Sequence, residues 1–255
     1  MMRQSPIVYA HRGASLELPE NTLPSFARAL ELGADALETD AHMTRDGHVV
    51  LSHDETGQRM AGIDTPIRHV TLEQLREWDV GWGFRDAAGA RPFEGKGYRV
   101  PTLAEALAAC PDVVFNVDAK QTEPDMVPAL LRVIRRAGAS HRVRIASFST
   151  ANLRRVRALG YEGETGLGPL EVARLALSPS WTRPRAAGHA AQVPPRGWGI
   201  TFASQAVIDR FHAAGVRVDF WTVDDPAEAT RLFALGADGV MTDDPARVVP
   251  VLRPA

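Results

Sequence analysis

The chain has 255 residues, which is long enough to bury one large core and is typical of a single α/β barrel. Its formal net charge of -2 and its ordinary composition give no basic surface of the kind that binds nucleic acid, so we expect no nucleic-acid partner. The single cysteine, Cys110, excludes an intrachain disulfide and alone makes a poor zinc site. The first ten residues lack the apolar stretch of a signal peptide, and no segment is apolar and long enough to span a bilayer. We therefore expect a soluble, cytoplasmic protein without a transmembrane segment.

Short apolar runs alternate with helical patterns along most of the chain. The apolar runs predict strands at 7–10, 36–43, 113–119, 143–148, 164–168, 199–203, 216–223 and 239–242. The patterns between them predict helices at 22–32, 124–137, 150–159, 204–214 and 226–235. Eight strands alternating with helices in a chain of this length favour an α/β fold of the (β/α)8 TIM-barrel type. We expect one domain over residues 1–255.

Two similar nonapeptides lie near opposite ends of the chain, LGADALETD at 32–40 and LGADGVMTD at 235–243. In each, the glycine suits the left-handed residue that ends a helix, and a predicted strand begins shortly after it. A closed barrel built from similar αβ units would leave such a repeat. The alternative is that helix-to-strand junctions converge on this pattern in any α/β protein.

Two segments interrupt the alternation. Residues 55–101 follow the second predicted strand and combine a short helical pattern, TLEQLREWDVG, with the glycine-rich stretch AAGARPFEGKGYRVP. In a barrel enzyme a lid-like insertion at this place would cover the face that carries the active site. Its aromatic side chains either form an apolar lid or pack against the barrel. Residues 177–197 are rich in proline, arginine and glycine and predict a second long loop.

The first and second predicted strands carry polar groups out of an apolar core. The run IVYA at 7–10 ends in His11, Arg12 and Gly13, so this strand presents an imidazole and a guanidinium at its end. In ALETDAH, side-chain alternation places Glu38 and Asp40 on one side together with His42. Two carboxylates facing inward repel unless a cation or a shared proton lies between them, and hard oxygen ligands favour Mg²⁺ or Ca²⁺ over zinc. The alternative is that both are solvated acids or ion-pair partners at the barrel rim.

The third predicted strand adds a further acid and a lysine. In VVFNVDAK the alternation places Asn116, Asp118 and Lys120 on one face, and Asp118 could complete a three-acid metal site. Three carboxylates with one divalent cation leave a negative charge, so Arg12 and Lys120 would balance an anionic substrate. The motif VVLSHD brings a second histidine, His53. Two histidines with a pKa of roughly 6.5 can exchange protons near neutral pH, which favours a phosphoester site.

Several short motifs occur together in this order, each of them weak alone. They are HRG at 11–13, PENT at 19–22, ETD at 38–40, HD at 53–54, PTL at 101–103, WTVDD at 221–225 and GADGVMTDDP at 236–245. In this combination the chain resembles the glycerophosphodiester phosphodiesterases from about residue 7 to residue 245. The resemblance implies a TIM barrel that hydrolyses small-molecule glycerophosphodiesters to glycerol 3-phosphate and an alcohol. It also implies one divalent cation, Mg²⁺ or Ca²⁺, with Mn²⁺ as a third option.

The resemblance also assigns roles to individual residues. It implies acid–base catalysis by two histidines, metal ligation by three acids, phosphate contacts from two cations and an aromatic contact with glycerol. The two histidines are His11 and His53, and the three acids are Glu38, Asp40 and Asp118. The two cations are Arg12 and Lys120, and the aromatic residue is Trp221. For Trp221, filling the core is the alternative. The insertion at 55–101 lies where the family carries a lid-like segment, and Asn21 is expected to cap the helix that begins near Thr22.

The chain departs from the family pattern at Asp118, where a metal-ligating glutamate is usual, and at Asp224, where asparagine is common. An aspartate carboxylate reaches about 1.5 Å less far than a glutamate carboxylate. A lysophospholipid or sphingolipid phosphodiesterase of the same fold and a non-catalytic phosphodiester-binding barrel are the alternatives. A glycosidase is disfavoured because Glu38 and Asp40 share one strand. The sequence gives no signal for oligomeric state.

Overall fold

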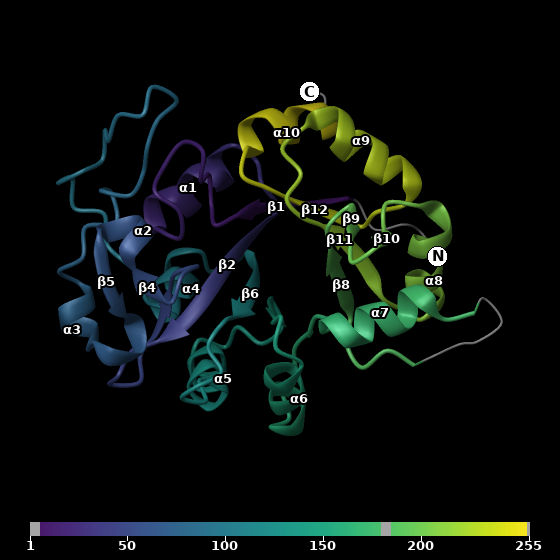
Figure 1. Cartoon of the computed structure of the whole chain (residues 1–255), viewed down its shortest axis with the longest axis horizontal. Coiled ribbons are helices and arrows are strands. Elements are labelled where there is room, and N and C mark those ends of the chain that lie inside the picture. Colours follow the sequence, from purple (N-terminus) through teal and green to yellow (C-terminus); the bar gives the residue numbers. More distant parts are fainter. Residues whose placement is uncertain (1–5, 180–184, 254–255) are drawn as a thin grey trace.

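The computed structural model describes residues 6–179 and 185–253. Its main sheet contains seven parallel strands in the order β7-β6-β2-β1-β12-β11-β8, and a short strand, β3, pairs antiparallel with β2. Figure 1 shows these strands curling around a common centre, with helices outside them. The strands are β1 (Ile7–His11), β2 (Ala36–Met43), β3 (Val49–Leu51), β6 (Val114–Ala119), β7 (Val143–Ala146), β8 (Ala190–Val193), β11 (Arg217–Phe220) and β12 (Gly239–Thr242).

A single pair of residues closes the ring between its two ends, β7 and β8. Thr165 forms a parallel bridge with Ile145 of β7, and Gly166 forms another with Ala190 of β8. Residues 165–166 thus occupy the eighth strand position, within the strand predicted at 164–168. The predicted α/β barrel is confirmed, with one strand reduced to two bridge residues.

One predicted barrel strand is wrong. Residues 199–203 contribute β10 (Ile200–Thr201), which pairs antiparallel with β9 (Arg196–Gly197) in a hairpin outside the barrel. The barrel strand is instead β8, inside the stretch 177–197 that was predicted as a loop; residues 180–184 of that stretch lie outside the described residues. The sequence of β8, AAQV, contains one β-branched residue and two alanines, so it lacks the apolar pattern by which strands are recognised.

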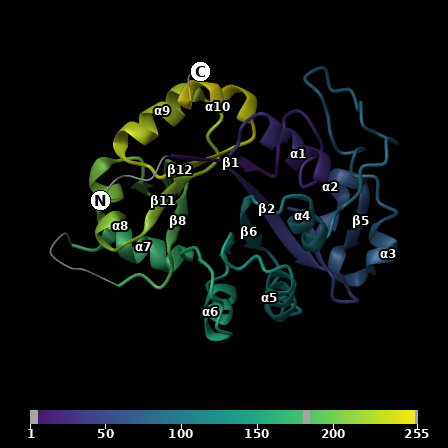
Figure 2. The same cartoon turned by 180° about the vertical axis from the view of Figure 1, so that it is seen from behind.

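The predicted helices are present, with bounds shifted by at most three residues at either end. They are α1 (Leu23–Glu31), α5 (Val127–Arg136), α6 (Thr150–Ala158), α8 (Gln205–Ala213) and α9 (Pro226–Leu235). The structure adds α4 (Leu103–Ala109), α7 (Pro169–Leu177) and α10 (Pro245–Leu252). Figure 2 shows from behind how α7, α8, α9 and α10 surround the half of the barrel that contains β8, β11 and β12. No helix among the described residues combines the length and apolarity needed to cross a membrane.

Ionic and hydrogen-bonded side chains fill part of the barrel interior. Arg144 donates one hydrogen bond to the Tyr9 hydroxyl at 2.9 Å and another to Asp219 Oδ2 at 2.8 Å. It also contacts Glu164 Oε2 at 2.6 Å. Because Arg144 satisfies the buried Asp219 carboxylate, the interior is closed here by a paired polar network rather than by an open channel.

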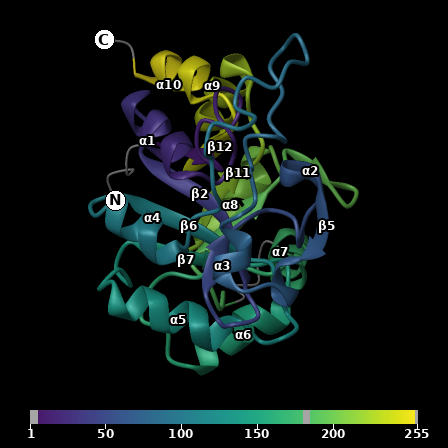
Figure 3. The same cartoon turned by 90° about the vertical axis from the view of Figure 1, so that its left-hand side faces the viewer.

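The insertion at 55–101 has a small core of its own. It contains β4 (Thr56–Gly57), α2 (Gln58–Ala61), β5 (Ile63–Pro66), the 3₁₀ turn η1 (Ile67–His69) and α3 (Leu72–Leu75). Trp78, Ile67 and Leu75 are buried together in one cluster with Val50 of β3. Figure 3 looks at the insertion from its own side, with α2, β5 and α3 toward the viewer. The segment thus lies against β3 and the β2 side of the barrel, and its role as a lid stays a prediction.

The repeated nonapeptide forms the same structure twice. The backbone N–H of Asp35 donates to the Val8 carbonyl at 3.0 Å, and its carboxylate accepts the Val8 N–H at 2.8 Å. Asp238 makes the same pair of bonds with Val218, at 2.9 and 2.8 Å. Each aspartate therefore ties the start of one barrel strand, β2 or β12, to the neighbouring strand, β1 or β11.

We expect Asp238→Ala to destabilise the fold by about 1–3 kcal/mol, because the Val218 N–H loses its acceptor. The same variant removes the 2.8 Å contact between Asp238 Oδ2 and His212 Nε2. Burial by itself would raise the pKa of Asp238, but hydrogen bonds from His212 and Val218 lower this pKa below its usual value. The stability that these hydrogen bonds contribute is therefore present above the unfolded-state pKa of about 3.9, and it is lost as the pH falls through the lower folded-state pKa.

Thermal unfolding at neutral pH measures the stability lost in Asp238→Ala, and Asp209→Ala, on the exposed face of α8, is the matched control. Equal melting temperatures for wild type and Asp238→Ala would contradict the assignment.

Candidate active site

All eight residues proposed from the sequence line one cavity of about 200 Å³. The cavity lies where the barrel strands end at their carboxyl termini, the place where TIM barrels build their sites. These residues are His11, Arg12, Glu38, Asp40, His53, Asp118, Lys120 and Trp221. Asn116 and Gln192 join them in the lining, and Gln192 Nε2 donates to Asn116 Oδ1 at 2.5 Å. No residue of 55–101 is part of the lining, and the role of this segment as a lid stays a prediction.

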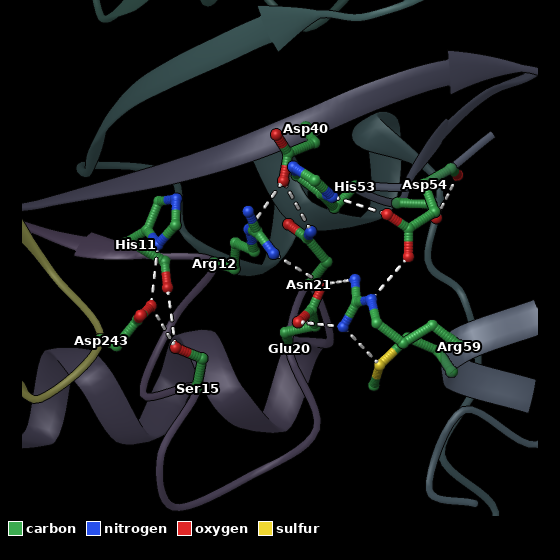
Figure 4. Close-up of polar contacts among 12 residues, drawn as sticks. His11, Arg12, Ser15, Glu20, Asn21, Asp40, His53, Asp54, Arg59 and Asp243 are labelled. Atoms are coloured by element: carbon green, nitrogen blue, oxygen red, sulfur yellow. Dashed lines mark hydrogen bonds and ion pairs between the residues drawn. The ribbon is translucent and has the colours of Figure 1, made fainter. Parts of the chain in front are cut away.

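His11 ends β1 and is held by Asp243, a residue that we did not predict. Its Nδ1 lies 2.7 Å from Asp243 Oδ1, and the Ser15 hydroxyl donates to the same oxygen at 2.8 Å (Figure 4). The Nε2 of His11 lies 3.8 Å from Glu38 Oε2. Burial alone would lower the pKa of His11, but Glu38 and Asp243 together raise it. The repeat carried a signal for Asp243, because it matches Asp243 with Asp40.

The turn after β1 aims Arg12 into the site. Arg12 and Gly13 both have positive φ, 61° and 88°, and a Cβ at Gly13 would clash with Ser25 of α1. The Nε of Arg12 lies 3.2 Å from Asp40 Oδ2, and its NH1 donates to Glu20 at 3.2 Å. Gly13 therefore lets the backbone turn sharply behind the strand end.

Asn21 does not cap α1, so that prediction is wrong. The N-cap is Thr22, whose hydroxyl accepts the Ser25 N–H. Asn21 instead has a left-handed φ of 54°, which turns its buried side chain toward β2. Its Nδ2 donates to Asp40 Oδ2 at 3.1 Å, and its Oδ1 accepts from the Thr39 hydroxyl at 2.6 Å. The PENT motif therefore fixes the Asp40 carboxylate.

Three buried carboxylates and one ammonium face each other across β2 and β6, where Asp40 and Asp118 are neighbours in register. Lys120 Nζ lies 3.0 Å from Asp40 Oδ1 and 2.7 Å from Asp118 Oδ2. Burial, followed by the Asp40 charge, raises the pKa of Glu38 to about 8. Burial also raises the pKa of Asp118, whereas Lys120 and Arg12 hold the pKa of Asp40 below its usual value despite its burial. Burial of Lys120 by itself would lower its pKa, but the charges of Asp118 and Asp40 raise it.

The donor chemistry of this cluster fits a hard divalent cation. Glu38 Oε2 and Asp118 Oδ1 are buried and have no hydrogen-bond partner within the described residues, so both lone pairs are available to a ligand. As the side chains stand, no three His, Cys, Asp or Glu groups of the described chain converge closely enough to enclose a metal. Lys120 supplies the positive charge between Asp40 and Asp118 instead.

His53 approaches the cavity from β3 and is held in the same way as His11. Its Nδ1 lies 2.7 Å from Asp54 Oδ1, and Arg59 of α2 binds Asp54 Oδ2 at 2.6 Å. Arg59 also forms two bonds with Glu20, at 2.7 and 2.8 Å, which links the insertion to the PENT turn (Figure 4). His42, expected on the face of Glu38 and Asp40, is not among the lining residues of this cavity, and its Nε2 lies 3.3 Å from the His53 carbonyl oxygen.

The opposite wall of the cavity is apolar. Trp221 follows β11, and its ring packs edge-on against Phe148 with the ring centroids 5.8 Å apart. Trp221 is half-buried, so it is a cavity-wall residue rather than a core filler. The other apolar lining residues are Ala146, Leu167, Pro169, Val172 and Trp198.

Fold and site together define a barrel enzyme with an acid, base and cation cluster suited to an anionic substrate. The model of the glycerophosphoryl diester phosphodiesterase family matches residues 11–247. The chain therefore belongs to that family and is an enzyme, a phosphoric diester hydrolase.

Individual relatives agree with this assignment. The chain is 32% identical over 256 residues to a glycerophosphodiester phosphodiesterase of Caldanaerobacter subterraneus subsp. tengcongensis, covering 97% of this chain and 98% of the relative. It is 27% identical to the human lysophospholipase D GDPD1, over 94% of this chain and 83% of that protein. The crystal structure of a glycerophosphodiester phosphodiesterase from Thermotoga maritima superposes with a TM-score of 0.74 at 26% identity, covering 97% and 99% of the two chains.

Proposed function

We propose that this enzyme hydrolyses glycerophosphodiesters to glycerol 3-phosphate and an alcohol by metal-dependent histidine acid–base catalysis. The observation that carries the proposal is the pair of histidines in one cavity, each with its Nδ1 on an aspartate and a cluster of buried acids and cations between them. An aspartate on Nδ1 fixes the tautomer in which Nε2 accepts or donates the transferred proton. A cytoplasmic location remains a prediction from the sequence.

In the proposed reaction His11 removes the proton from the glycerol 2-hydroxyl, whose oxygen then attacks phosphorus. His53 donates a proton to the departing alkoxide, so the alcohol leaves neutral and a cyclic phosphate remains. Water opens the cyclic phosphate with the two histidines in reversed roles, which restores both protonation states. Arg12 and Lys120 stabilise the charge on the phosphoryl oxygens, and Trp221 packs against the glycerol carbons.

We assign Glu38, Asp40 and Asp118 as the residues that would hold one divalent cation, Mg²⁺, Ca²⁺ or Mn²⁺. When bound, such a cation polarises a phosphoryl oxygen and lowers the pKa of a hydroxyl group beside it. Two buried carboxylate oxygens without a hydrogen-bond partner among the described residues, Glu38 Oε2 and Asp118 Oδ1, support the assignment. Asp118 contacts Lys120 through Oδ2, and its Oδ1 has no hydrogen-bond partner among the described residues, which supports a ligand role for the shorter acid.

The test is release of glycerol 3-phosphate from glycerophosphocholine and glycerophosphoethanolamine, with EDTA or with added Mg²⁺, Ca²⁺ or Mn²⁺. We expect release that depends on a divalent cation. Asp118→Glu restores the longer acid, and a faster rate in this variant would identify the short acid as limiting. Absence of release from both substrates with every cation would overturn the proposal.

A lysophospholipid, or the corresponding sphingolipid, is the second candidate substrate, and the apolar wall favours it. Glycerol and phosphate offer little apolar surface, whereas Phe148, Trp198 and Trp221 present three aromatic rings to the cavity. The human relative named lysophospholipase D supports this reading. Comparing kcat/KM for lysophosphatidylcholine and glycerophosphocholine decides between the two.

We expect Asp243→Asn to lower kcat roughly 10²-fold or more with little change in KM, because His11 loses the carboxylate that fixes its Nδ1–H. Ser15→Ala is the matched control, since it removes only the hydroxyl that supports Asp243 and should cost far less. Steady-state kinetics on glycerophosphocholine measure both variants. A kcat for Asp243→Asn within twofold of wild type would remove Asp243 from the site.

A further inference from the structure

Three large apolar side chains stand exposed around the mouth of the cavity. Phe148 is 56% exposed, Leu170 72% and Trp198 58%. Phe148 and Trp198 line the cavity itself, and Leu170 lies at the start of α7 between the lining residues Pro169 and Val172. We call Phe148, Leu170 and Trp198 the apolar rim. Single exposed apolar residues are ordinary, but a group that surrounds one opening marks a binding surface.

Trp198 occupies a position that its side chain does not favour. It forms the tip of the β9–β10 hairpin with Gly199, and both residues have positive φ, 51° and 76°. Asparagine and glycine adopt this turn most readily, whereas a tryptophan there is strained. The indole stays largely exposed, although its edge touches Phe202 at a centroid distance of 6.0 Å. Core packing therefore does not account for a tryptophan at this tip, and strain of this kind points to function.

The cavity itself is too small to hold an apolar tail. Its volume of about 200 Å³ lies below the roughly 300–1,000 Å³ of sites that enclose a drug-sized ligand. A phosphodiester with its glycerol fills it, and any apolar matter attached to that substrate must lie outside, over the rim. Because Phe148 and Trp198 belong both to the cavity lining and to the rim, a surface that covers the rim lies at the mouth of the cavity.

We propose that the apolar rim docks the barrel mouth on a lipid surface, a bilayer or micelle from which the enzyme draws its substrate. The inference rests on the proposed function for the identity of that substrate. Exposed arginines accompany the rim: Arg196 is two residues from Trp198, and Arg174 is one helical turn from Leu170. Both side chains are exposed, so their guanidinium groups are accessible to lipid phosphates. Tryptophan and arginine side by side suit the lipid–water interface, where the ring enters the head-group layer and the guanidinium binds lipid phosphates.

The test measures binding of the full chain to vesicles made of equal parts phosphatidylcholine and phosphatidylglycerol, by co-sedimentation and without turnover. Trp198→Asn removes the ring and installs a residue that favours the same turn, so the hairpin is retained. Leu170→Ser removes the second rim side chain and does not line the cavity. We expect the double variant to lower the vesicle partition coefficient about tenfold or more. Val251→Ser, an exposed apolar residue on α10, is the matched control and should bind like wild type.

Wild-type protein that stays in the supernatant, or a double variant that binds vesicles as wild type does, would overturn the proposal. Self-association of wild type that the double variant lacks, without vesicle binding, would assign the rim to a second copy of this chain and overturn it equally. Hydrolysis of glycerophosphocholine in lipid-free buffer reports the proposed function separately, and Leu170→Ser should retain it. Loss of vesicle binding in the double variant therefore supports docking whether or not that assay succeeds.

Discussion

Replacing either cavity histidine with asparagine is expected to lower kcat by about 10²–10⁴-fold, the usual contribution of a positioned general acid or base. His11→Asn and His53→Asn each remove the Nε2 that exchanges a proton with the substrate. Each Nδ1 is bound to an aspartate at 2.7 Å, so both imidazoles are held in one orientation before substrate arrives. Because neither histidine belongs to the proposed metal ligands, KM should change much less than kcat.

The double variant distinguishes a shared proton-transfer cycle from two independent contributions. If the two histidines act in one cycle, losing the second costs little after the first is lost, and the two effects are far from multiplicative. His48→Asn, on an exposed turn between β2 and β3, is the matched control and should leave kcat unchanged. Single variants with rates near wild type would remove the histidines from the mechanism.

The sequence predicted the barrel and its site because the same physical rule governs both. Carboxyl ends of parallel strands meet at one face of a barrel, so polar residues that follow apolar strands must lie together there. The runs at 36–43 and 239–242 match β2 and β12 at both ends. Strand alternation also placed Glu38, Asp40 and Asp118 in one cavity with Lys120.

What could not be predicted depends on contacts that leave no periodic trace. The strand β8 is short and rich in alanine, and its burial comes from neighbours that close the ring rather than from its own pattern. Arg59 lies 39 residues from Glu20, and its bridge to Asp54 depends on how the insertion packs. Asp243 was within reach, since its counterpart Asp40 in the repeat had been assigned to the site. The repeat therefore carries a signal for the chemistry as well as for the fold.

Lys120→Met is expected to make the stability of the protein depend on divalent cations. Lys120 Nζ lies between the Asp40 and Asp118 carboxylates, at 3.0 and 2.7 Å, so its removal leaves two buried carboxylates facing each other. Removing one partner of a buried ion pair costs about 3–5 kcal/mol, and we expect the lower end here because Lys120 is partly exposed.

A divalent cation at the same carboxylates would return much of that loss, since a ligand that binds only the folded state stabilises it by mass action. The melting temperature of Lys120→Met should therefore rise more on adding Mg²⁺ or Ca²⁺ than that of wild type, while EDTA should lower it. Lys96→Met, at an exposed lysine of the insertion, is the matched control and should respond as wild type does. Melting temperatures that no divalent cation raises, in Lys120→Met and in wild type alike, would show that no metal binds at these acids. Because unfolding is followed without substrate, a larger cation response in Lys120→Met would locate the cation independently of catalysis and of the role given to either histidine.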